Sequence, residues 1–152
     1  EFLHTEHFTS GKVRGYQAQD RKWSDEFDRW KEQHPDGVEQ VYLQGLVDEL
    51  DAFLAECRRD EIMVVLVYPP EYGQARDMVN NRGEIFAIYR DLADKYQVEF
   101  LDYSYDAMAD DTKYFYNSQH LNKLGSELFS TKLAGRLAGL LQAGAGEVAG
   151  LP

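Results

Sequence analysis

The chain has 152 residues, of which 43% are hydrophobic and 13% aromatic. A chain of this length buries roughly 70% of its extended surface on folding, so it can form a globular domain without a disulfide or a structural metal. Its formal net charge of -11 repels phosphates and anionic membrane surfaces. The charge therefore argues against a nucleic-acid partner and against membrane contact.

The single cysteine and the apolar runs set further limits on the class of protein. Cys57 has no partner for an internal disulfide, and it lies in an apolar helical stripe where a buried thiol acts as a small hydrophobe. No stretch approaches the roughly 20 apolar residues that a membrane span needs. The first residues do not show the basic-then-apolar pattern of a signal peptide, and from the abrupt start at Glu1 we expect that upstream sequence is missing.

The first part of the chain predicts one short helix after an irregular lead-in. Residues 1–22 are polar and show no sustained period. Trp23, Phe27 and Trp30 then fall on one face of a helix. Ser24 would cap this helix and Pro35-Asp36-Gly37 would end it. We interpret the aromatic face as core packing.

A strand-helix-strand unit occupies the middle of the chain, after a helix predicted over 38–59. Residues 62–67 form an unbroken apolar run rich in β-branched side chains, which predicts a strand buried on both faces. A helical period spans 85–96, and 98–102 is a second short strand. Such units connect parallel strands by a right-handed crossover, so we expect both strands in one parallel sheet.

The last part of the chain predicts a loop at 103–120 and a helix that starts near Leu121 or Asn122 and ends at Gly144-Ala145-Gly146. We divide the chain into a lead-in (1–22), an α/β domain (23–143) and a frayed tail (144–152). The expected fold is a three-layer α/β/α arrangement with a mostly parallel sheet. On periodicity alone, a flavodoxin-like or receiver domain stays an alternative.

Ligands and catalytic groups in open α/β sheets collect beyond the carboxyl ends of the strands. After the first strand the chain reads Tyr68-Pro69-Pro70, after the second Asp102-Tyr103-Ser104, and before the last helix it reads His120-Leu121-Asn122-x-x-Gly125. In this order the three segments resemble the later part of the SGNH/GDSL hydrolase superfamily, and more closely its extracytoplasmic bacterial lipase-like and acyltransferase-like branch. That family's last block is Asp-x-x-His-Leu-Asn-x-x-Gly.

The resemblance implies acyl transfer through a serine, with a histidine as general base and an acid three residues earlier that orients it. His120 takes the position of the base. Asn117 takes the position of the acid, and an amide can orient an imidazole but cannot stabilise the imidazolium as a carboxylate does. Neighbouring acids (Asp102, Asp106, Asp110 and Asp111) would substitute only if the loop folds back.

The nucleophile and oxyanion motifs of the family are missing from the sequence. The chain has no Gly-Asp-Ser turn, and Ser10 is the only serine early enough, although no strand-like run precedes it. Asn80 and Asn81 follow no strand, so we do not assign them to an oxyanion hole. We therefore expect the C-terminal portion of an ester hydrolase or O-acyltransferase for a glycan or lipid ester, with the serine supplied from outside this chain.

Several alternatives stay open. A domain that keeps the fold as a binding or assembly module would equally have Asn117 and lack the serine. His120 would then only cap or pack against the last helix. The His4-x-x-His7 pair has no evident third ligand, so we predict no metal and no cofactor. The resemblance implies an extracytoplasmic location, and we expect a missing N-terminal portion or a second copy of the chain to cover the sheet edge.

Overall fold

The computed structural model describes the backbone of residues 19–148 and the side chains as far as Gln142. The elements of the described part, in chain order, are α1 (Glu26–Gln33), α2 (Gln44–Arg59), β1 (Val65–Tyr68), α3 (Gly73–Asp77), α4 (Arg82–Tyr96), β2 (Glu99–Asp102), the 3₁₀ turns η1 (Ala107–Asp110) and η2 (Thr112–Tyr114), β3 (Phe115–Asn117), β4 (His120–Leu121) and α5 (Lys123–Val148). The protein is a mixed α/β structure.

The predicted strand-helix-strand unit is confirmed. Strands β1 and β2 pair in parallel, in a register that joins Val65 to Glu99 and Tyr68 to Asp102. Both strands therefore end at the same edge of the sheet. The short helix α3 and the longer helix α4 connect them.

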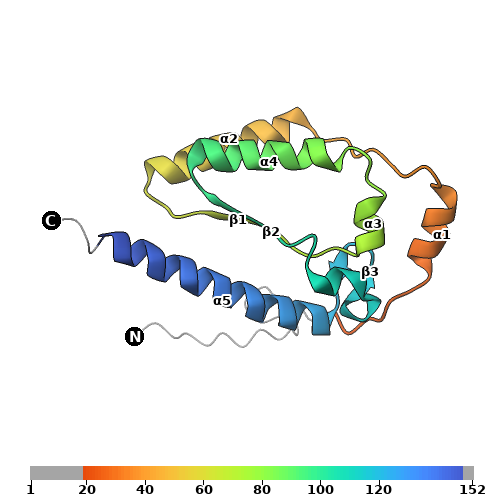
Figure 1. The fold of residues 1–152 in the computed structure, drawn as a ribbon. Helices are drawn as coiled ribbons and strands as arrows, with labels where there is room; N and C mark the ends of the chain where they lie inside the picture. The colour runs from red at the N-terminus through yellow and green to blue at the C-terminus, as the bar shows by residue number, and fades with distance from the viewer. Residues whose placement is uncertain (1–18, 149–152) are drawn as a thin grey trace, which may run out of the picture.

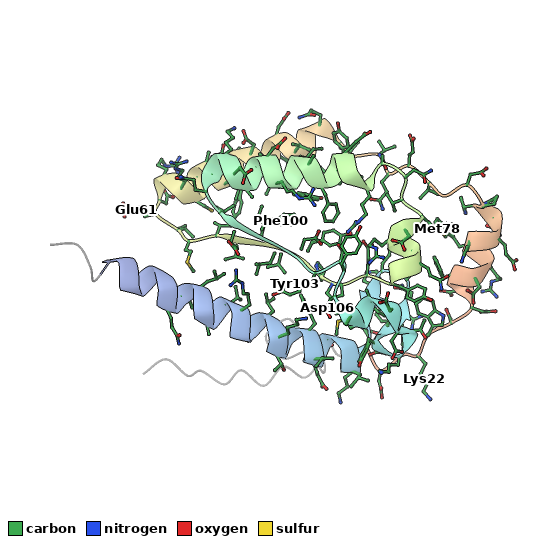
Figure 2. The ribbon with its side chains drawn as sticks, viewed as in Figure 1. Lys22, Glu61, Met78, Phe100, Tyr103 and Asp106 are labelled. Atoms are coloured by element: carbon green, nitrogen blue, oxygen red, sulfur yellow. The ribbon has the colours of Figure 1, made fainter. Side chains whose placement is uncertain are left out.

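Helices lie on both sides of this small sheet. In Figure 1, α2 and α4 run along one side of β1 and β2, and α5 runs along the other. Phe100 packs on that first side against Phe86 and Tyr89 of α4, with ring centroids 6.0 and 5.9 Å away. Tyr103, which follows β2, packs edge-on against Phe129 of α5 at 5.1 Å (Figure 2). Aromatic side chains in and just after β2 thus contact both α4 and α5.

The helix predicted over 38–59 begins later than expected. Residues 38–43 are not helical, and α2 starts only at Gln44. The reason is tertiary, since Val38 accepts and donates backbone hydrogen bonds with Asn80 (2.8 Å) and Met78 (2.7 Å). Asn81 adds side-chain bonds to both backbone groups of Gln40. The asparagines that we left out of the oxyanion hole therefore hold this segment.

The expected full burial of the first strand is wrong. The four residues of β1 are only partly buried, and Ile62 and Met63, which precede it, are 57% and 61% exposed. Within α2, Leu54 and Cys57 are buried as expected, whereas other members of the apolar stripe face outward. The most exposed of these are Leu46 and Phe53, and Leu43, which precedes the helix, is exposed too. Among the described residues β1 pairs only with β2, which leaves its other edge open.

Other boundaries also differ from the prediction. Ser24 does not cap α1, because Asp25 stands at the N-cap and makes no side-chain capping bond. The aromatic face of α1 is confirmed, with Phe27 buried and 6.0 Å from both Trp23 and Trp30. The stretch 103–120 is not a plain loop, since two 3₁₀ turns and the β3–β4 hairpin lie in it.

Helix α5 runs on to Val148, past the glycines at which the sequence predicted its end. The tail predicted at 144–152 is therefore helical for its first five residues. The rest of it, and residues 1–18 of the predicted lead-in, lie outside the described residues. Of the helices in the described part, none combines the length and the hydrophobicity that a bilayer crossing requires.

Candidate functional site

The β3–β4 hairpin brings Asn117 and His120 together. Asn117 Oδ1 accepts the backbone N–H groups of Gln119 (3.1 Å) and His120 (2.9 Å), which closes the turn. The same oxygen lies 2.9 Å from His120 Nδ1. Two backbone donors identify this atom as the amide oxygen, which can only accept. His120 Nδ1 therefore carries the proton, and the basic lone pair of the neutral ring is on Nε2.

The imidazole is held but not buried. His120 is exposed, and its ring stacks on Tyr116 with centroids 5.4 Å apart and planes at 13°. The guanidinium carbon of Arg21 lies 5.1 Å from the centroid of the same tyrosine ring. A histidine held through Nδ1 and exposed to solvent is able to exchange protons at Nε2.

Two further members of the His-Leu-Asn-x-x-Gly block, Asn122 and Gly125, have structural tasks. Asn122 is buried; its Nδ2 donates to the carbonyls of Lys113 (2.7 Å) and Phe115 (3.2 Å). Its Oδ1 accepts from the backbone N–H of Gly125 (3.0 Å), which caps the first turn of α5. A Cβ on Gly125 would overlap the carbonyl of Tyr114. These contacts fix the hairpin on α5. They account for an asparagine and a glycine at these positions without a catalytic role for either residue.

A cavity of about 370 Å³ lies beside the hairpin. Asn117, Ser118 and Gln119 form one wall, and Phe27 and Trp30 of α1 contribute to the other. His120 is not among its lining residues, so the predicted base does not face this cavity directly. A more open hollow of about 650 Å³, lined by charged residues of α1 and the turn after α3, is larger but contains none of the predicted site residues.

Glu71 is a functional candidate that the sequence reasoning missed. It lines the 370 Å³ cavity, and its Oε1 lies 3.0 Å from Arg82 Nη1 and 3.3 Å from the hydroxyl of Tyr68. Burial raises the pKa of this carboxyl, and the nearby Arg82 guanidinium only partly opposes that effect. Burial also raises the pKa of Tyr68. The position directly after β1, in Tyr68-Pro69-Pro70-Glu71, is the signal that could have found it.

The acids of the second loop have other partners. Asp102 Oδ1 accepts from the backbone N–H (3.0 Å) and the hydroxyl (2.5 Å) of Ser104. Asp106 and Asp111 cap the two 3₁₀ turns. Asp110 lies against Gly73 of α3, where a Cβ would come within 3.0 Å of its Oδ1. No hydrogen bond or ion pair joins any of these four acids to His120 in the described part of the chain, so Asn117 remains the residue that orients the imidazole.

The aromatic residues of both loops mostly cover the core. Phe115 is fully buried, and Tyr72 packs against Phe115, Trp23 and Phe27 with centroids 4.7 to 6.3 Å away. Ser10 and the His4/His7 pair lie outside the described residues. Within the described part of the chain, no group of three or more His, Cys, Asp or Glu is placed to hold a metal ion.

Comparison with known proteins adds no relative. The chain matches no protein-family model, and searches against curated proteins and against solved structures give no match either. The geometry of the hairpin is therefore the observation from which a function is inferred.

Proposed function

We propose that this chain supplies the base-bearing part of an SGNH-like ester hydrolase or O-acyltransferase that acts on a glycan or lipid ester. The observation that carries the proposal is the Asn117–His120 pair, in which Asn117 sets the Nδ1–H tautomer and leaves His120 Nε2 as a base. A tautomer fixed in this way is the requirement for a general base in acyl transfer. The exposed position of the ring leaves room for a nucleophile beside it.

In this mechanism His120 Nε2 removes the proton from a serine hydroxyl as the serine oxygen attacks the ester carbonyl. The imidazolium then returns the proton to the departing alcohol, which leaves an acyl-serine. Water completes a hydrolysis, and a second alcohol completes a transfer, each with His120 again as base. Because Asn117 carries no charge, it stabilises the imidazolium less than the family's carboxylate does.

The nucleophile is proposed to come from a segment that is not part of these 152 residues. The free edge of β1 can accept a further strand, and we propose that this strand also covers exposed apolar residues of α2 and of the segment just before β1. This added strand would also widen the two-stranded sheet, as the three-layer arrangement expected from the sequence requires. We propose a strand from another part of the same protein as the occupant; a second copy of the chain would instead produce a concentration-dependent dimer in light scattering.

The test is serine labelling of the full-length protein by a fluorophosphonate, together with hydrolysis of p-nitrophenyl acetate. His120→Ala is expected to abolish both, while the control His34→Ala, which changes a histidine bonded to the Trp30 carbonyl, keeps them. Asn117→Asp is expected to raise the hydrolysis rate, by up to about 10⁴-fold on the precedent of serine proteases. A protein that neither reacts with the fluorophosphonate nor hydrolyses the ester refutes the proposal.

A binding or assembly module of the same fold is the second candidate. It is favoured by one observation, since Asn117 Oδ1 accepts two backbone N–H groups that close the hairpin turn, a structural task that involves no catalysis. The Asn117→Asp variant separates the two candidates. An unchanged, negligible esterase rate in that variant supports the binding module, and a large gain supports an impaired enzyme.

A further inference from the structure

Three arginine side chains line a pocket that is separate from the cavity beside the hairpin. The pocket has a volume of about 230 Å³, and Arg76, Arg82 and Arg90 contribute to its lining. Asp102, the last residue of β2, is also part of the lining, which places the pocket at the carboxyl edge of the sheet. The whole chain carries 27 acidic and 16 basic residues, so a pocket lined by three arginines stands out in this acidic protein.

Arg76 is a rigid part of this pocket. The residue is 9% exposed, and its Nη1 donates to the carbonyl of Ser104 at 2.9 Å. Its Nε donates to Asp77 at 2.7 Å, and its guanidinium carbon lies 4.1 Å from the centroid of the Tyr105 ring. These contacts fix the plane of the guanidinium before any ligand arrives, which reduces the entropic cost of binding.

Arg82 and Arg90 enter from one face of α4, with Phe86 between them. The guanidinium carbons lie 3.7 and 5.8 Å from the centroid of the Phe86 ring. Arg82 Nη1 pairs with Glu71, but Arg82 Nη2 is buried and has no hydrogen-bond acceptor. A buried donor without an acceptor costs about 1–3 kcal/mol, so an acceptor at this position would be stabilising.

The charges around the pocket leave a positive excess. Its two carboxylates are engaged, Asp77 by Arg76 and Asp102 by the backbone and hydroxyl of Ser104. Among the described residues Arg90 has no ion pair, and its side chain is exposed at the mouth. An anion would therefore meet one unpaired guanidinium at the rim and partly paired ones behind it.

We propose that this pocket binds the phosphate group of a small phosphomonoester. A guanidinium presents a planar fork of N–H donors that matches phosphate oxygens. A phosphomonoester has three terminal oxygens and so can engage three guanidinium groups, whereas a carboxylate has two oxygens. The net charge of -11 disfavours approach to an anionic membrane, which favours a dissolved ligand over a lipid headgroup. The volume exceeds that of a bare phosphate and leaves space for an organic part beside Tyr105.

The experiment is a titration of the full 152-residue chain with inorganic phosphate, followed by NMR of the arginine side-chain N–H signals. Saturable shifts are expected at Arg76, Arg82 and Arg90. Arg90→Gln is expected to weaken the phosphate affinity about tenfold, the value of one charge-assisted hydrogen bond. The matched control is Arg29→Gln, which removes an exposed arginine paired with Asp25 and should leave the affinity unchanged.

Three outcomes would overturn the assignment. The first is the absence of saturable shifts. The second is an equal loss of affinity in the Arg29 and Arg90 variants, which would indicate non-specific charge attraction. The third is acetate binding as tight as phosphate binding, or binding to phosphatidic acid vesicles without binding to free phosphate. Because the readout is binding and not ester hydrolysis, the result is independent of the function proposed for His120.

Discussion

Gly125 provides the sharpest test of how the hairpin is attached to α5. A Cβ at this position would overlap the Tyr114 carbonyl and lie 3.0 Å from Leu121 Cδ2. That carbonyl also accepts the backbone N–H of Asn122 at 2.9 Å. Gly125→Ala must therefore move a hydrogen-bonded backbone group, which is harder than turning aside a flexible side chain.

The expected magnitude follows from a comparison within the same helix. Gly135, also in α5, has no atom within 4 Å of an added Cβ. Alanine in place of glycine in a helix gains about 1 kcal/mol of propensity at either site, and this gain cancels when the variants are compared. Overpacking costs about 1–3 kcal/mol and a weakened backbone hydrogen bond about 1 kcal/mol. We expect Gly125→Ala to be less stable than Gly135→Ala by about 2–4 kcal/mol.

Urea unfolding monitored by circular dichroism measures both variants, provided the slope with denaturant is the same. Gly135→Ala should be more stable than the wild type and Gly125→Ala less stable. Equal midpoints for the two variants would refute the reasoning, because the close approach of Tyr114 would then have no energetic consequence.

Three other predictions concern stability. Burial raises the pKa of Glu71 above its ordinary 4.5, so the folded state holds the carboxyl proton to higher pH than the unfolded chain does. Protonation of Glu71 therefore stabilises the fold fully below about pH 4.5, and this stabilisation is lost as pH rises through the folded pKa. Glu71→Gln, which mimics the protonated form, should therefore gain stability relative to the wild type as the pH is raised, measured by urea unfolding at several pH values. Asp106→Ala should cost about 1–2 kcal/mol, since Asp106 caps η1 and pairs with Lys132, and thermal unfolding measures the loss. Leu54→Ala, at a residue 1% exposed, should cost about 2–5 kcal/mol, whereas Leu46→Ala, at 60% exposure on the same helix, should change the unfolding free energy by less than about 0.5 kcal/mol.

Each of these three predictions would be contradicted by a specific result. A stability difference between Glu71→Gln and the wild type that falls with rising pH would contradict the raised pKa. A neutral Asp106→Ala would mean that the cap and the ion pair are too weakly formed to matter. Equal losses at Leu54 and Leu46 would show that the outer face of α2 is covered in solution.

Helix and strand periods were readable from the sequence because they depend on neighbouring residues. The period of Ile85, Ile88 and Leu92 predicted α4, and the β-branched run before Tyr68 predicted β1. The start of α2 was not readable in this way. Val38 is extended because its backbone pairs with Met78 and Asn80, some 40 residues away, and no local preference encodes that pairing.

The candidate site likewise has parts that the local sequence predicts and parts that depend on tertiary packing. Asn117 and His120 are three residues apart, so a single turn suffices to join them, and the sequence alone placed them together. The bonds of Asn122 to two carbonyls, the burial of Glu71 and the meeting of Arg76, Arg82 and Arg90 were decided by packing. A local motif can fix a contact across one turn. Whether a side chain is buried, and whether side chains from distant parts of the chain come together, depends on which surfaces meet, and that is a property of the whole fold.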